Sequence, residues 1–219
     1  MDAAPASFWR RNGLSLVLAC MFITALCGQF VVGHRVSEAE HAREGRPPES
    51  LVEYASSGHF ISATFENWES EFLQMGMYVL LTVWLRQRGS AESRPLDPAQ
   101  EEERIDAGPT PRPVLAGGAW KALYANSLSL AFLALFLASF VLHLYGSWQD
   151  ELAVRAAAGQ PPIEVWQHLA GAEFWFESLQ NWQSEFLAVL AIVVLSIFLR
   201  QDKSPESKPL RAPHGQTGT

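Results

Sequence analysis

The sequence predicts an all-α membrane protein with four transmembrane helices, arranged as two tandem helical hairpins in a parallel repeat with cytoplasmic termini. Three observations lead to this prediction. Apolar residues make up 48% of the 219 residues and gather in long uncharged runs. The chain matches itself when it is shifted by 114 positions. Basic residues concentrate in alternate segments between the runs, which fixes an orientation.

Two of the apolar runs are long enough to cross a bilayer. Leu14–Gly33 contains no charged residue over 20 positions, and Leu123–Trp148 contains none over 26. About 20 apolar residues in a helix span the roughly 30 Å hydrocarbon layer. Arg10 and Arg11 precede the first run, as they do in a cleaved signal peptide. A copy of this run recurs in mid-chain, where no signal is cleaved, so we expect a retained helix.

Two further runs are shorter. Phe72–Leu85 and Phe186–Leu199 each hold 14 uncharged residues, which cover only about 21 Å as a helix. A helix buried in a soluble core is the alternative, but each run pairs with a long span and ends on Arg-Gln. To cross the membrane, each helix begins about six residues earlier. Glu71 and Glu185 are thereby carried to the membrane boundary.

The internal repeat aligns residues 12–96 with residues 126–210 without a gap, with 27 identities in 85 positions. The stretch NWESEF at 67–72 returns as NWQSEF at 181–186. Each copy holds two spans, so both copies enter the membrane in the same direction. The expected relation is a pseudo-twofold axis along the membrane normal.

The distribution of charge gives the orientation. The segments before the first span, between the second and third spans and after the fourth span, counted with the arginines that end the second and fourth spans, carry 12 Lys and Arg, and the two loops on the other side carry four. The positive-inside rule then makes the termini cytoplasmic, in a bacterial inner membrane. The outer side carries a net charge of −10 when Glu69, Glu71 and Glu185, at the outer ends of the second and fourth spans, are counted with the loops. The linker and the tail are expected to be disordered, because proline-rich and polar segments bury no core.

These boundaries define the predicted organisation. The segments are a cytoplasmic N-terminus at 1–11, repeat 1 at 12–96, a disordered linker at 97–119, repeat 2 at 120–210, and a disordered tail at 211–219. Repeat 1 has spans at about 14–33 and 67–86 around an outer loop at 34–66. Repeat 2 has spans at about 126–147 and 181–200 around an outer loop at 148–180.

The repeated hexapeptide supplies the candidate site. Apolar residues before and within it recur at intervals of 4, 3 and 4, which predicts that one helix runs through the hexapeptide into the span. Its polar residues fall at i, i+3 and i+4, on one helix face. A carboxylate near hydrocarbon needs protein, water or a partner. The candidate ion or polar site is Asn67, Ser70 and Glu71 with Asn181, Ser184 and Glu185.

A second interpretation of the hexapeptide stays open. Glu71 and Glu185 at headgroup height remain hydrated and need no ion. Asn67 and Asn181 then bond to neighbouring helices, a common contact in membrane bundles, and the tryptophans anchor the interface. The two interpretations differ by a few ångströms in depth, which sequence does not fix.

Other polar residues give weaker signals. His34, His41 and His59 lie in the first outer loop, but their spacing is not repeated in the second copy, so we predict no metal site there. Gln29 and His143 occupy equivalent positions in the outer halves of two spans. They either support the glutamates or meet water. No nucleotide-binding loop, nucleophile elbow or basic stripe is present. We therefore predict no enzyme, no cofactor, no metal and no nucleic-acid partner.

Several motifs together resemble a known family. NGLSLVL at 12–18, FENWESEFLQ at 65–74, GSAES at 89–93 and the second copy's NWQSEFL are similar to an uncharacterised bacterial family of small multi-pass membrane proteins, classed as a domain of unknown function. The resemblance covers roughly residues 8–210. It implies a bacterial inner-membrane protein with this duplicated layout, and it carries no activity, ligand or catalytic residue.

The expected function is a non-enzymatic membrane protein, an interaction or envelope-maintenance component. The alternative is a small cation or proton transporter or channel that uses the carboxylates of the repeated Asn-Trp-x-Ser-Glu-Phe stretch. Expected partners are the lipid bilayer and either a second copy of the chain or another membrane protein. Four helices are few for a monomeric transporter, so the alternative also predicts an assembly.

Overall fold

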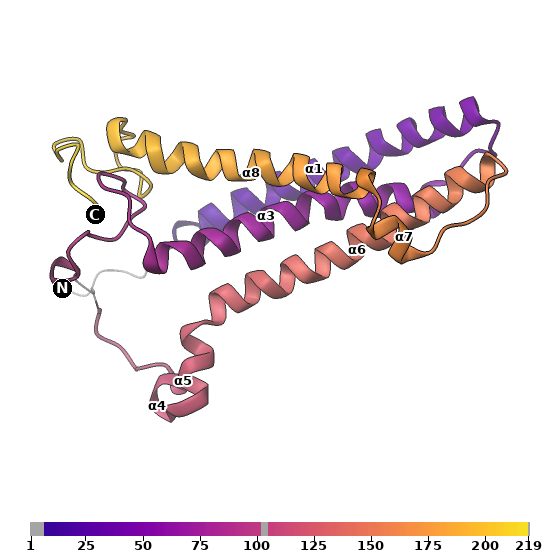
Figure 1. Cartoon of the computed structure of the whole chain (residues 1–219). Coiled ribbons are helices and arrows are strands. Elements are labelled where there is room, and N and C mark those ends of the chain that lie inside the picture. The colour runs from indigo at the N-terminus through magenta and orange to yellow at the C-terminus, as the bar shows by residue number, and fades with distance from the viewer. Residues whose placement is uncertain (1–6, 102–104, 219) are drawn as a thin grey trace. The chain divides into compact units, whose positions relative to one another are not determined.

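The structure is a computed structural model of the whole chain, and it describes residues 7–101 and 105–218. The predicted N-terminal segment and the predicted disordered linker at 97–119 lie partly outside these residues, as does the end of the predicted tail. The described part is helical and has no strand, which confirms the all-α class. The elements are α1 (Phe8–Glu44), α2 (Leu51–Tyr54), α3 (Gly58–Trp84), the 3₁₀ helix η1 (Pro98–Gln100), α4 (Arg112–Ala116), α5 (Gly118–Ala125), α6 (Ser127–Ala157), α7 (Val165–Leu169) and α8 (Ala172–Phe198) (Figure 1).

Three of the described helices, α1, α6 and α8, are long and apolar enough to cross a membrane. The fourth predicted span lies within α3, which has 27 residues, as α8 does. A 27-residue helix is about 40 Å long, enough to cross a bilayer. The length of α3 agrees with the expectation, but its crossing of the membrane remains a prediction. Both α3 and α8 run without a break through the hexapeptide, as the apolar spacing predicts.

The chain divides into two compact units, which are described separately. The first unit is Met1–Ala63 with Tyr145–Val165, and the second is Thr64–Leu144 with Trp166–Thr219. The long helices α3 and α6 each contribute to both units.

The first unit has Tyr54 at its centre, with only 1% of its surface exposed. The rings of Phe30, His34, His59 and Phe60 lie around it, at centroid distances between 5.4 and 5.9 Å. The start of α2 is fixed by a capping box, in which the Ser50 hydroxyl and the Glu53 carboxylate each accept a backbone N–H.

Helices α3 and α6 touch through glycines in the first unit. A Cβ on Gly146 would lie 2.5 Å from the backbone nitrogen of Ser62, and a Cβ on Gly58 would lie 2.6 Å from the carbonyl oxygen of Gly146. Both separations are far below a van der Waals contact, so only glycine permits this approach.

The second unit has a polar interior. Its buried polar residues include Thr64, Glu69, Ser70, Gln74, Ser139, His143, Ser178 and Ser196, and its buried large apolar residue is Phe174. Leucine, valine and phenylalanine side chains of α6 and α8 are instead widely exposed. Large exposed apolar surfaces around a polar interior are consistent with helices that face lipid.

The segments that follow α3 and α8 contact each other in the second unit. The hydroxyls of Ser90 and Ser196 are 3.0 Å apart, and the backbone N–H of Gly89 donates to the Thr217 hydroxyl at 2.8 Å. The Lys208 ammonium is buried and donates to carbonyl oxygens, which belong to Gly89, His214 and Gln216. Composition predicts disorder for 211–219, and three residues of this segment, His214, Gln216 and Thr217, make these contacts in the structure.

Candidate cation site

His143 is the centre of the polar cluster in the second unit. It lies on α6 and is fully buried. Its ring stacks on Phe174 of α8, with centroids 4.8 Å apart and planes 28° apart. Phe140, one helical turn earlier on α6, meets the same Phe174 ring edge-on at 5.7 Å. The aromatic contacts therefore hold the imidazole in one orientation.

Glu69 on α3 determines which nitrogen of His143 carries a proton. Its Oε2 lies 2.9 Å from Nδ1 of His143, and both side chains are fully buried. Its other oxygen, Oε1, accepts the indole N–H of Trp182 at 2.9 Å. An ionised carboxylate only accepts hydrogen bonds, so Nδ1–H is the donor of this pair. In the neutral imidazole, Nε2 then carries a free lone pair.

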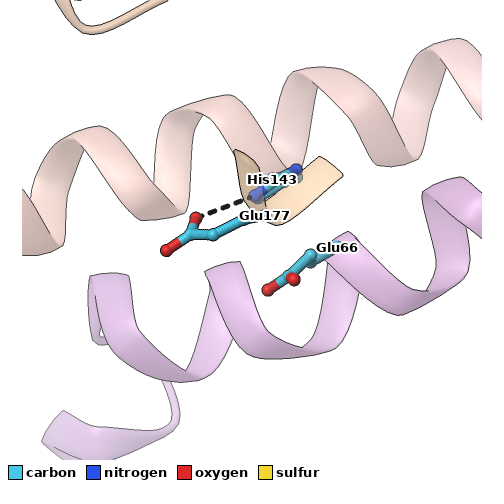
Figure 2. Close-up of side chains that lie close together, drawn as sticks. All are labelled: Glu66, His143 and Glu177. Atoms are coloured by element: carbon cyan, nitrogen blue, oxygen red, sulfur yellow. Dashed lines mark ion pairs between the residues drawn. The ribbon is translucent and has the colours of Figure 1, made fainter. Parts of the chain in front are cut away.

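Nε2 of His143 faces two further carboxylates. It lies 3.8 Å from Oε2 of Glu177 on α8 and has no hydrogen-bond partner although it is buried. Glu66, His143 and Glu177 each offer one ligand atom, and these atoms all lie within 4.8 Å of one another. Figure 2 shows Glu66 on α3 and Glu177 on α8 directed to the same side of the imidazole.

Helical periodicity brings these residues together. Glu66 and Glu69 are at i and i+3 on α3, so they share one face. Glu177 and Asn181 are at i and i+4 on α8, and the Asn181 amide donates to both Oε1 of Glu66 and the carbonyl oxygen of Glu177. The amide of Asn181 thereby ties α8 to α3 beside the candidate ligands.

The six residues of the predicted site are placed differently from one another. Asn181 joins the cluster through Glu66. Asn67, Glu71 and Ser184 are exposed, Ser70 is buried, and Glu185 is half-buried. The hydroxyls of Ser70 and Ser184 donate to carbonyl oxygens three residues earlier, at 2.8 Å each, so both are used within their own helices. The carbonyl of Glu185 accepts the side-chain amide of Gln74 at 3.0 Å.

Sequence reasoning missed Glu66, Glu69 and Glu177, and it gave His143 only a supporting role. It favoured residues that are identical in both copies, whereas the positions 114 residues from these four hold Gln180, Gln183, Ala63 and Gln29. One sequence signal was available, since His143 is the only titratable side chain in the run Leu123–Trp148 apart from tyrosines. Ionisable groups inside a predicted span are functional candidates by default.

The comparison with family models gives one match, to a domain of unknown function (DUF6766), which covers residues 5–219. The chain belongs to this family. The resemblance seen in the motifs is thereby confirmed, over a range slightly longer than the motifs cover. No curated protein and no solved structure matches the chain. The cluster around His143 therefore has to be interpreted from its own geometry.

The cluster has the chemistry of a cation site. It joins three carboxylates and one imidazole inside a bundle of apolar helices, and the ion pairs recorded for Glu69 and Glu177 are both with His143. Nε2 of a protonated His143 forms a long ion pair with Glu177 at 3.8 Å, whereas in the neutral imidazole its lone pair and the carboxylate repel each other in a region of low dielectric. A cation between them removes the repulsion and satisfies the buried nitrogen.

Proposed function

We propose that this chain is a non-enzymatic, multi-pass membrane protein that binds a cation inside its helical bundle, between Glu66, His143 and Glu177. The observation that carries the proposal is the buried Nε2 of His143, which has no hydrogen-bond partner and faces two carboxylates. Buried polar atoms are almost always satisfied, so an orphaned one calls for an occupant. The interaction or envelope-maintenance role expected from sequence stays a prediction.

The test is thermal melting of the chelator-treated protein in detergent, in a panel of alkali, alkaline-earth and transition-metal chlorides. A cation that binds only the folded state at 100 times its Kd stabilises by about 2.7 kcal/mol, which corresponds to about 5–10 °C for a chain of this size. We expect at least one cation to give such a shift in the parent.

Substitutions test whether the cation-dependent rise in melting temperature comes from the site at His143. His143→Gln installs the residue found 114 positions earlier, and we expect it to abolish the shift. Glu71→Gln is the matched control on α3, because Glu71 is exposed and lies in the repeated hexapeptide. A shift that is kept in His143→Gln and lost in Glu71→Gln would move the site to the hexapeptide. No shift with any cation would reject the proposal.

Cation transport is a second candidate function, and one observation favours it. The side chain of Glu177 is 39% exposed, whereas those of Glu69 and His143 are fully buried. The exposed carboxylate of Glu177 gives a cation a first contact outside the bundle, from which it can reach the buried imidazole of His143. Flux of the stabilising cation into vesicles that contain the protein distinguishes transport from static binding, with His143→Gln as the inactive control.

We also propose that the protein lies in a bacterial inner membrane with four spans and cytoplasmic termini. The support is the excess of basic residues in the predicted cytoplasmic segments, 12 against four. Topology reporters fused after residue 40 and at the C-terminus provide the test. Four spans put the C-terminus in the cytoplasm and residue 40 outside. If α3 does not cross, the C-terminus lies on the opposite side from the N-terminus.

A further inference from the structure

We infer that the bound cation is a divalent first-row transition metal, held one per chain by Nε2 of His143 and the carboxylates of Glu66 and Glu177, with Glu69 as the residue that positions the imidazole. This inference rests on the cation site proposed above and names the class of ion.

The ligand types favour this class. Magnesium and calcium prefer shells made entirely of oxygen ligands, and the site offers an imidazole nitrogen as well. Imidazole with carboxylates suits zinc, iron and manganese, while copper(I) prefers thiolate and thioether ligands. The ligand cluster contains no sulfur atom. A borderline divalent ion therefore fits better than a hard or a soft one.

The spacing of the ligand atoms is close to what one ion requires. Nitrogen and oxygen ligands bind zinc at about 2.0–2.2 Å, so two ligands on one ion are at most about 4.4 Å apart. The three candidate ligand atoms are already within 4.8 Å of one another. Binding of one ion therefore requires the glutamate carboxylates to move closer to Nε2 by rotation of their side chains.

Glu69 supplies the support that metal-bound histidines usually have. Such histidines commonly donate their second ring N–H to a carboxylate, which fixes the tautomer and raises the basicity of the ligating nitrogen. Here Nδ1 is bonded to Glu69 at 2.9 Å, and the indole of Trp182 holds Glu69 in place. Nε2 is thereby left free on the side where Glu66 and Glu177 lie.

The net charge of the cluster favours a divalent ion. Glu66, Glu69 and Glu177 bring three negative charges if all are ionised, and the neutral imidazole brings none. An ion of charge +2 lowers the uncompensated charge to a single unit, whereas a monovalent ion leaves two. Uncompensated charge in an apolar bundle is costly.

The two sequence copies predict the stoichiometry. The positions 114 residues away from the cluster hold glutamines and an alanine, namely Gln180, Gln183, Gln29 and Ala63. Amide and methyl groups do not replace the ionised ligands of a transition metal. We therefore expect one metal ion per chain in spite of the internal repeat.

The experiment is a titration of the chelator-treated protein in detergent with Co²⁺, whose ligand-field absorption reports nitrogen and oxygen ligation. The parent is expected to bind one Co²⁺ per chain, and one equivalent of Zn²⁺ is expected to displace it. Glu66→Gln, His143→Gln and Glu177→Ala each install the residue of the other copy, and each is expected to abolish the spectrum. Glu71→Gln is expected to bind as the parent does.

Variants of Glu69 separate positioning from folding. Glu69→Gln is expected to keep one site per chain while its affinity for Co²⁺ falls about 10- to 100-fold. Glu69→Asp keeps the carboxylate and is expected to recover part of the loss. Equal Co²⁺ affinity in the parent and in Glu69→Gln would show that Glu69 does not position the imidazole.

The outcomes distinguish this inference from the broader proposal. Stabilisation by Na⁺ or Ca²⁺ through His143 without a Co²⁺ spectrum would overturn the transition-metal inference and leave the cation site standing. No response to any cation would overturn both. Glu177→Ala is the variant least expected to misfold, because the Glu177 side chain is partly exposed. A metal-free melting temperature close to that of the parent shows that the variant is folded.

Discussion

The surroundings of Tyr54 and of Phe174 are built in the same way, yet only one of them has the features of a binding site. Each ring is 1% exposed and is surrounded by other aromatic rings and by imidazoles. Around Tyr54 the imidazoles have partners: His34 meets the carbonyl of Glu49 at 2.8 Å, and His59 meets the Tyr54 hydroxyl at 3.3 Å.

The cluster at Phe174 differs because its imidazole is only half satisfied. His143 is completely buried, and one of its nitrogens, Nε2, has no hydrogen-bond partner. The comparison shows that aromatic packing is common to both centres, whereas a buried imidazole nitrogen without a hydrogen-bond partner beside two carboxylates is found at His143. The following predictions test this difference, in order of expected effect.

Removal of the Phe174 ring is expected to have the largest effect. Phe174→Ala deletes a buried ring that stacks on His143, and such substitutions cost about 3–5 kcal/mol. The melting temperature and the Co²⁺ affinity should fall together, because the same ring orients the imidazole. Phe176→Ala is the control, since Phe176 is 68% exposed. Equal melting temperatures for the two variants would contradict the role of Phe174 as the packing centre.

The glycine contact in the first unit is expected to matter next. In Gly146→Ala the new Cβ meets backbone atoms of the start of α3, and overpacking of this kind costs about 1–3 kcal/mol. Gly28→Ala in α1 meets nothing within 4 Å and should stabilise by about 0.5–1 kcal/mol. Melting curves of the two variants should move in opposite directions. Cation binding is expected to survive in Gly146→Ala at temperatures where the variant is folded.

A smaller effect is expected when the Tyr54 hydroxyl is removed. Burial raises the pKa of Tyr54 above its ordinary value, so the hydroxyl stays protonated and is hydrogen-bonded to Nδ1 of His59. Tyr54→Phe keeps the aromatic contacts and loses one hydrogen bond, worth about 0.5–1.5 kcal/mol. Tyr124→Phe, at a residue 46% exposed, is the control. A loss as large as that in Phe174→Ala would show that the hydroxyl, and not the ring, organises the first unit.

The smallest effect concerns pH and lies in the segment after α3. Burial raises the pKa of Glu92 above its ordinary 4.5, the hydrogen bond from the Tyr78 hydroxyl opposes this, and the hydrogen bond and charge of Glu206 add to the rise. The folded protein therefore holds the proton more tightly, and stability from this group falls as pH rises from 4.5 through the raised pKa. Glu92→Gln should melt slightly above the parent at pH 7, and the difference should shrink as the pH falls below 4.5. An identical difference in both pH ranges would exclude the titration of Glu92 as its cause.

Local pattern was sufficient to predict much of the fold. Uncharged runs identified three helices able to cross a membrane, and the apolar spacing predicted that α3 and α8 pass through the hexapeptide. These features depend on residues close together in the chain, for which helical periodicity is reliable. Membership in a family of unknown function was likewise expected from the resemblance and is confirmed by the match to residues 5–219.

The candidate site could be predicted only in part. Helix α3 carries Glu66, Glu69 and Glu71, and successive residues turn by about 100°, so Glu71 lies roughly 160° from Glu69 around the helix. The internal repeat drew attention to Glu71, which is exposed, and away from Glu69, which is fully buried. Which glutamate faces His143 depends on how α3 and α6 pack. A search for residues that are identical in both repeats finds residues that both repeats require. It misses a site whose residues have no identical counterpart in the other repeat.

The most direct test is X-ray absorption at the zinc edge of the protein loaded with one equivalent of Zn²⁺. We predict a single shell of nitrogen and oxygen ligands at about 2.0–2.2 Å that includes one imidazole and no sulfur. The imidazole signal should vanish in His143→Gln and persist in Glu71→Gln. A spectrum without imidazole, or one that His143→Gln leaves unchanged, would contradict a metal site at His143.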